Sequence, residues 1–157
     1  MKGAEHSSAF SALASAKAKI LLLGQSGPHF ADLVSRGRSL NIEHVSPAFL
    51  VQQEISRRTP HGQQAELAIS RSASPQNIDR IHLAILRKWF WARKPDAGFL
   101  LEGFPATLLQ ALVFDEWLEA RGENLTCCFA PDLQNADPVV TYYRTQGLLF
   151  GAIPAAA

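Results

Sequence analysis

Short apolar runs alternate with helical patterns along most of this chain. Residues 19–24 (KILLLG) form an apolar run that ends at a glycine, which is typical of a buried parallel strand. Further runs of the same character occur at residues 42–46 (IEHVS), 97–105 (AGFLLEGFP), 125–131 (LTCCFAP) and 148–153 (LLFGAI). The pattern therefore predicts five strands.

Helical patterns fill the segments between these runs. Residues 29–37 (HFADLVSRG) place apolar side chains at helical spacing, and we expect this helix to end at Gly37. Further helices are predicted at residues 46–58, 60–72, 74–94, 107–122 and 137–147. Ser46, Ser74 and Asp137 each precede a proline, which is the usual N-cap and first-turn signal of a helix.

Strands separated by helices indicate an α/β fold. We expect a three-layer αβα arrangement with a five-stranded parallel sheet and right-handed crossovers. One domain should span residues 19–153, between a flexible Ala/Ser-rich leader (1–18) and a tail (154–157). Ligands of such sheets bind beyond the carboxyl ends of the strands. The loops after Leu23 and Leu101 are therefore where a site is expected.

Composition narrows the choice of partners. Of 157 residues, 47% are hydrophobic and 18% are charged, with a formal net charge of +1, which suits one domain of ordinary size. No excess of either charge points to nucleic acid or to an anionic membrane. No apolar run reaches the roughly 18 residues that a membrane helix needs. We therefore expect no nucleic-acid partner and no membrane partner.

The cysteines and histidines show no pattern of a metal or redox site. Cys127 and Cys128 are adjacent within an apolar run, so we expect them on opposite faces of a sheet, as reduced thiols of a cytoplasmic protein. The five histidines lack metal-ligand spacing, and His82 is expected to be a partly buried neutral imidazole. The sequence predicts no metal and no other cofactor.

The stretch from Gly24 to Asp32 (GQSGPHFAD) has the layout of a phosphate-binding loop. Such a loop, G-x-x-x-x-G-K-[ST], surrounds phosphates with backbone N–H groups, a lysine and a hydroxyl that ligates Mg²⁺. The lysine and the hydroxyl residue are missing here. A plain strand-to-helix turn, with glycine for its backbone angles, is the alternative interpretation.

Three segments in a fixed order resemble the adenylate kinase family of nucleoside monophosphate kinases. Residues 98–111 (GFLLEGFPATLLQA) are similar to the family's G-F-L-L-D-G-F-P-R-T-x-x-Q-A. Residues 139–149 (VVTYYRTQGLL) are similar to its final helix and last strand, and residues 45–65 stand where it has I-S-T-G-D-M-L-R and G-x-Q-A. The resemblance runs from about Lys19 to Phe150 and implies a P-loop nucleoside triphosphate hydrolase-like fold.

The family's phosphate-handling residues are missing at the matching positions. Phe30 replaces the loop lysine, Asp32 replaces its hydroxyl residue, and Gln52 and Ala106 replace two arginines. The family's lid and its arginines are absent, because only DLQNA separates the fourth strand segment from the final helix. Phosphoryl transfer depends on such charges. The resemblance therefore implies a protein that has lost transfer and has no catalytic residue.

Six residues keep positions of the family's nucleotide site: Gly24, Gln25, Ser26, Gly27, Glu102 and Gln110. Glu102 matches an acidic residue that holds Mg²⁺ through water, and Gln110 matches a glutamine that reads the adenine edge. The alternative for Glu102 is a helix cap or a partner of Lys or Arg. The alternative for Gln110 is a surface amide.

The expected function is that of an adenylate kinase-like binding or regulatory module whose ligand is an adenine nucleoside or nucleotide. An active nucleoside monophosphate kinase with a rearranged site and a structural or dimerisation module are the alternatives. The stretch 87–94 (RKWFWARK) favours a homodimer or protein partner, because aromatic residues and arginine are enriched in interface hot spots.

Overall fold

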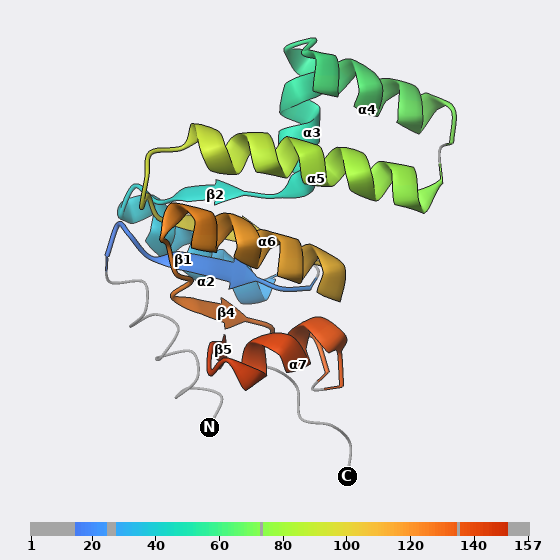
Figure 1. Cartoon of the computed structure of the whole chain (residues 1–157). Coiled ribbons are helices and arrows are strands. Elements are labelled where there is room, and N and C mark those ends of the chain that lie inside the picture. The colour runs from blue at the N-terminus through green and yellow to red at the C-terminus, as the bar shows by residue number, and fades with distance from the viewer. Residues whose placement is uncertain (1–14, 25–27, 73, 135, 151–157) are drawn as a thin grey trace. The chain divides into compact units, whose positions relative to one another are not determined.

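The computed structural model describes residues 15–24, 28–72, 74–134 and 136–150 (Figure 1). These residues form two compact units. The first, called the sheet unit, comprises described residues up to Val45 and from Pro95 onward. The second, called the helical unit, comprises Ser46–Lys94. The single domain over residues 19–153 stays a prediction, and the sequence pattern does not mark the division at Val45 and Pro95.

The two ends of the chain lie partly outside the described residues. The expected leader is described only from Ser15, where the carbonyls of Ala16 and Ala18 accept hydrogen bonds from the N–H groups of Gly98 and Phe99 at 3.0 and 2.9 Å. These residues therefore add to the start of the sheet. The expected tail lies outside the described residues.

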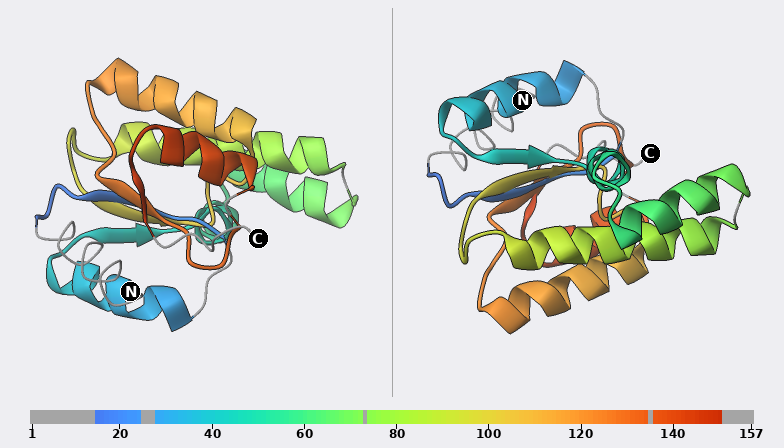
Figure 2. Two further views of the ribbon diagram at one scale, coloured as in Figure 1. Left: turned by 90° about the horizontal axis from the view of Figure 1, so that it is seen from below. Right: turned by 90° about the horizontal axis from the view of Figure 1, so that it is seen from above.

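The sheet unit contains β1 (Lys19–Leu22), β2 (Glu43–Val45), β3 (Phe99–Glu102), β4 (Cys127–Phe129) and β5 (Leu149–Phe150). All neighbouring strands are parallel, in the order β2-β3-β1-β4-β5. Figure 2 shows α2 (Pro28–Ser39) on one face of the sheet, and α6 (Leu108–Arg121) and α7 (Pro138–Thr145) on the other. The predicted three-layer α/β fold with a five-stranded parallel sheet is confirmed.

Alternate strand residues form the core between the sheet and α2. Ile20 and Leu22 of β1 pack there with Phe30 of α2. Cys127 belongs to the same core, whereas Cys128 lies near Asp115 of α6, on the other face. The prediction that the adjacent cysteines point to opposite faces is therefore confirmed.

The helix α2 does not end at Gly37, as its sequence suggested, but continues to Ser39. A Cβ on Gly37 would lie 2.7 Å from Cδ1 of Leu100, so this glycine allows the helix to approach the sheet closely. The turn that follows has Asn41 at a φ of 58°. Glycine occurs both at helix ends and where a helix packs closely on a sheet. The sequence pattern alone does not distinguish these two roles, so the predicted helix end at Gly37 was wrong.

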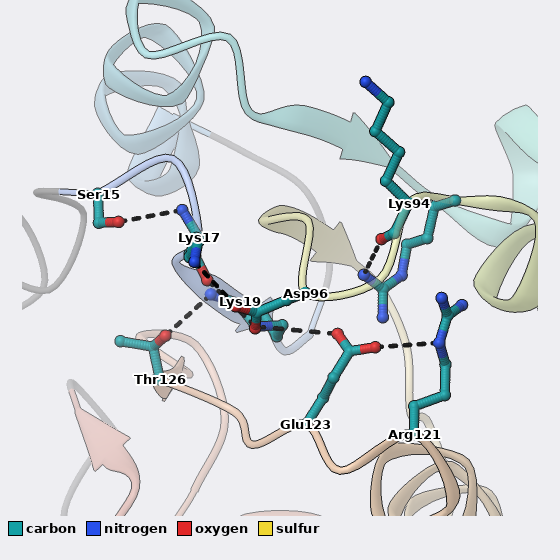
Figure 3. A network of polar contacts seen from close by, with 9 residues as sticks. Ser15, Lys17, Lys19, Lys94, Asp96, Arg121, Glu123 and Thr126 are labelled. Atoms are coloured by element: carbon teal, nitrogen blue, oxygen red, sulfur yellow. Dashed lines mark hydrogen bonds and ion pairs between the residues drawn. The ribbon is translucent and has the colours of Figure 1, made fainter.

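A buried ion network lies where β1 begins, at the amino edge of the sheet (Figure 3). Nζ of Lys19, a side chain only 4% exposed, is 2.5 Å from Oδ1 of Asp96 and 3.8 Å from Oε1 of Glu123. Nε of Arg121 is 3.2 Å from the other carboxylate oxygen of Glu123. The pKa of Asp96 lies below its usual value because Lys19 donates a hydrogen bond to its carboxylate. This network compensates charges that would otherwise be costly to bury.

The helical unit consists of α3 (Pro47–Ser56), α4 (Pro60–Ser70) and α5 (Pro75–Ala92). Each begins at a proline that follows a hydroxyl N-cap, and the caps are Ser46, Thr59 and Ser74. Lys88 of α5 donates to both carboxylate oxygens of Glu54 of α3 at 3.0 Å. His82 is half-buried, as predicted, and burial lowers its pKa, which favours the neutral imidazole. Among the described residues, no helix has the length and apolarity to cross a membrane.

Candidate functional site

The carboxyl ends of β1, β3 and β4 meet at one edge of the sheet unit. The register pairs Leu22 with Glu102 on one side and with Phe129 on the other. The N–H of Gly103 donates to the carbonyl of Leu22 at 2.9 Å, so β3 follows β1 up to this edge. The loop after β1 and the loop after β3 therefore emerge side by side, where open parallel sheets bind ligands.

Gly24 opens the loop after β1 with a φ of +95°, a conformation that side-chain-bearing residues rarely adopt. Gln25, Ser26 and Gly27, which were predicted to belong to the vestigial site, lie outside the described residues. The described part of the loop thus keeps the glycine turn that both interpretations of this stretch require.

Phe30, at the position of a loop lysine, points into the core of the sheet unit. Its side chain is 1% exposed. Its ring packs edge-to-face against that of Phe129, with the ring centroids 6.0 Å apart and an interplanar angle of 63°. The side chain at the lysine position therefore stabilises the fold and has no group that could neutralise a phosphate.

Glu102, the last residue of β3, pairs with a residue that sequence reasoning overlooked. Its Oε1 is 3.3 Å from Nε2 of His44 on β2, and its side chain is 15% exposed. The expected alternative was a pair with Lys or Arg. The register of β2 against β3, in which Val45 lies beside Leu101, is the signal that brings His44 near Glu102.

Gln110 serves as part of the N-terminal cap of α6. It is 8% exposed, so the surface-amide alternative is wrong. Its Oε1 accepts a hydrogen bond from the N–H of Ala106 at 2.8 Å, while Oγ1 of Thr107 accepts from the N–H of Gln110 at 3.2 Å. This is the reciprocal pattern of a capping box, shifted by one residue. Among the described residues, Nε2 of Gln110 has no hydrogen-bond partner.

The thiols at this sheet are poor nucleophiles and poor metal ligands. Burial raises the pKa of Cys127 to about 12, and that of Cys128 is also raised well above its ordinary value, mainly by burial. Both thiols therefore stay protonated at neutral pH, and the thiolate is the reactive form. Nowhere in the described ranges do three or more His, Cys, Asp or Glu side chains gather as a metal site would need.

The sequence relatives agree on one family. An adenylate kinase of Moorella thermoacetica is 33% identical over 111 residues, which cover 68% of this chain and 49% of that protein. An adenylate kinase of Clostridium botulinum is 29% identical over 119 residues, 73% of this chain and 53% of that protein. One of Prochlorococcus marinus is 28% identical over 121 residues, 76% of this chain and 64% of that protein.

The chain is related to the adenylate kinase family. It spans about half the length of its relatives from Moorella and Clostridium. No protein-family model matches it.

The cations of the sheet unit lie on one side of the sheet. Every described Lys and Arg of this unit lies at the amino edge of the sheet, opposite the site: Lys17, Lys19, Arg36, Arg38, Arg121 and Arg144. Two precede or begin β1, and the others occupy the last turns of α2, α6 and α7, where they complement the helix dipoles. The described residues of the sheet unit therefore offer no Lys or Arg to a phosphate at the carboxyl edge.

Acidic residues, by contrast, do lie on the same side of the sheet as the candidate site. Asp32 is exposed in the first half of α2, Glu102 ends β3, and Asp132 follows β4. Ala106, at the position of one of the family's arginines, is exposed on the segment after β3. In the helical unit, Gln52 at the other arginine position is exposed on α3. The two missing arginines are therefore replaced by neutral residues at the surface, whereas the missing loop lysine is replaced by the buried Phe30.

Proposed function

We propose that this chain binds an adenine nucleoside or nucleotide and does not transfer phosphate, so that it acts as a binding or regulatory module. The observation that carries the proposal is the burial of Phe30 in the core at the family's lysine position. The absence of Lys and Arg from the carboxyl edge of the described sheet unit supports it.

The energetic reason is that phosphoryl transfer is driven by charge neutralisation and positioning. Removal of a single cation that stabilises the transition state can cost about 10³ to 10⁵ in rate. Here the position of the loop lysine is occupied by Phe30, an aromatic core residue, and Asp32 adds a negative charge on the same helix. A metal ion bridging the phosphates would lack the loop hydroxyl, and Glu102 is already paired with His44. Several of the groups that accelerate phosphoryl transfer are thus missing together.

Base recognition depends on different groups, of which Gln110 is the one that keeps its position in the family pattern. The carbonyl oxygen of Gln110 holds the N-terminus of α6, which fixes the orientation of the amide. The amide nitrogen is left to donate to a ring nitrogen of adenine, the role that the family resemblance suggests for this residue. A fixed amide loses little conformational freedom when a ligand binds.

The decisive experiment measures catalysis and binding separately. A coupled assay should detect no conversion of ATP and AMP to ADP at the usual kinase rate of about 1 to 100 per second. Calorimetric titration with adenosine, AMP and ATP should detect binding no tighter than roughly 10 μM, or about 7 kcal/mol. Turnover in the kinase range would instead establish an active enzyme, and no binding of any of the three would favour a structural module.

Two substitutions of Gln110 separate base reading from capping. Gln110→Glu keeps an acceptor for the N–H of Ala106 but removes the amide donor, whereas Gln110→Ala removes both. We expect Gln110→Glu to fold with nearly wild-type stability and to lose adenosine binding. Gln110→Ala should lose binding and also about 1 kcal/mol of stability. Adenosine binding that survives in Gln110→Glu would exclude the amide as the base-reading group.

A further inference from the structure

The connection between β4 and α7, residues 130–137 and here called the β4–α7 connection, is held at both ends. The N–H of Ala130 donates to the carbonyl of Phe150 at 3.0 Å, and Ala130 is fully buried. At the other end, Oδ1 of Asp137 accepts a hydrogen bond from the N–H of Val139 at 2.9 Å, which caps α7. The first residue of the connection is therefore held by the sheet, and its last residue by the helix.

Leu133 of this connection lies against the first residue of the candidate site. A Cβ built on Gly24 would be 3.3 Å from Cγ of Leu133, and 3.5 and 3.8 Å from its two methyl carbons. The Leu133 side chain is itself half-buried. An aliphatic group without donors or acceptors therefore covers the start of the loop after β1.

The Leu133 side chain disfavours the binding of a phosphate group at this position but is compatible with a nucleobase. A phosphate group placed beside Leu133 would lose water without gaining a hydrogen-bond donor from this side chain, which is unfavourable. The planar, largely apolar face of a nucleobase gains from the same contact. Phe30 contributes only an apolar ring to the adjoining core, so it supplies no compensating charge.

We infer that Leu133 is a specificity-determining residue, which makes the site select an uncharged adenine nucleoside over its phosphorylated forms. In the family pattern a lid with arginines is inserted between the fourth strand and the final helix, whereas here the short connection presents Leu133. The choice of adenine rests on the proposed function, but the exclusion of phosphate rests on the contact between Leu133 and Gly24.

The test uses calorimetric titration of three variants and the wild-type chain with adenosine, ATP and inorganic tripolyphosphate. Leu133→Lys places a cation beside Gly24, and Leu133→Ala removes the cover without adding charge. The matched control is Gln134→Lys, which adds the same charge at the exposed neighbouring residue. Circular dichroism melting shows that each variant is folded before it is titrated.

We expect Leu133→Lys to tighten ATP binding relative to adenosine by about tenfold or more, the effect of one charge-assisted hydrogen bond. It should also acquire binding of tripolyphosphate. Leu133→Ala should shift the ATP-to-adenosine ratio in the same direction by about threefold, because no cation replaces the side chain. Gln134→Lys should behave like the wild type with all three ligands.

Equal gains in Leu133→Lys and Gln134→Lys would overturn the inference, because added charge alone would then explain the binding. Wild-type binding of ATP more tightly than adenosine would also overturn it. If the wild type binds neither adenosine nor ATP, the proposed function fails. The tripolyphosphate titrations still decide the inference in that case: a gain confined to Leu133→Lys supports it, and no gain refutes it.

Discussion

The substitution Phe30→Lys restores the family's lysine. We expect it to lower the free energy of unfolding without creating a phosphate site. The ring of Phe30 is 1% exposed and packs on Phe129 within the core between α2 and the sheet. The substitution removes the aromatic group from this core and places an ammonium group on a side chain that starts there. Stability should fall because the side chain of residue 30 points into the core.

The size of the effect can be worked out from these contacts. Burial of a phenylalanine side chain contributes about 1.5 to 3 kcal/mol, and an edge-to-face aromatic pair adds about 0.5 to 1.5 kcal/mol. The lysine stem recovers part of the burial, but its charge has to remain in an apolar environment, lose its proton or displace the helix. We therefore expect a loss of about 3 to 5 kcal/mol, in the range of large-to-small core substitutions of phenylalanine.

Urea denaturation followed by circular dichroism measures this loss as a lower midpoint at an unchanged slope. Phe30→Leu is the matched control that keeps an apolar side chain, and it should lose only about 1 kcal/mol. Asp32→Lys places the same cation at an exposed position of α2 and should change stability by no more than about 0.5 kcal/mol. A Phe30→Lys protein as stable as Phe30→Leu, with tighter ATP binding, would refute the reasoning, because its ammonium group would then reach the site.

Two further predictions concern buried polar groups of the sheet unit. Glu123→Gln should lower the free energy of unfolding by about 3 kcal/mol, because it removes a buried charged partner of Lys19. The control is Glu119→Gln, which changes an exposed residue and should have little effect. Equal losses of stability in urea titrations of the two variants would contradict the prediction. Tyr143→Phe should leave stability unchanged or raise it by up to about 1 kcal/mol, because the buried Tyr143 hydroxyl has no hydrogen-bond partner among the described residues. Tyr142→Phe is its control and should lose about 1 kcal/mol, since that hydroxyl donates to a carboxylate of α6, and a larger loss in Tyr143→Phe would show that its hydroxyl is bound.

The order of elements and the class of fold could be predicted from the sequence. Each of the apolar runs contains one of the five strands, and the cap-plus-proline pairs at Ser46, Ser74 and Asp137 mark the starts of three helices. These signals are local, because a strand or a helix start depends on a few neighbouring residues. The absence of the loop lysine and of the hydroxyl residue can likewise be read directly from the sequence, which has Phe30 and Asp32 at these positions.

The roles of the site residues depended on the tertiary structure. The sequence allowed Gln110 to be a surface amide or a base reader, but its carbonyl turns back to the N–H of Ala106. It left Glu102 with several partners, and the register of β2 beside β3 supplied His44. The spacing of Thr107 and Gln110 is that of a capping box, a signal that could have indicated the capping role, whereas the contact of Glu102 with His44 has no signature in residue spacing.

The sequence by itself determined which chemical groups this protein possesses, and therefore which phosphate-binding groups it lacks. Only the tertiary structure decided where the remaining groups point, as with Phe30 in the core and Leu133 against Gly24. The physical reason is that side-chain identity is carried by one residue. A contact such as that of Leu133 with Gly24 joins two loops that are remote in the chain, and it exists only because parallel pairing of β1 with β4 brings their carboxyl ends together.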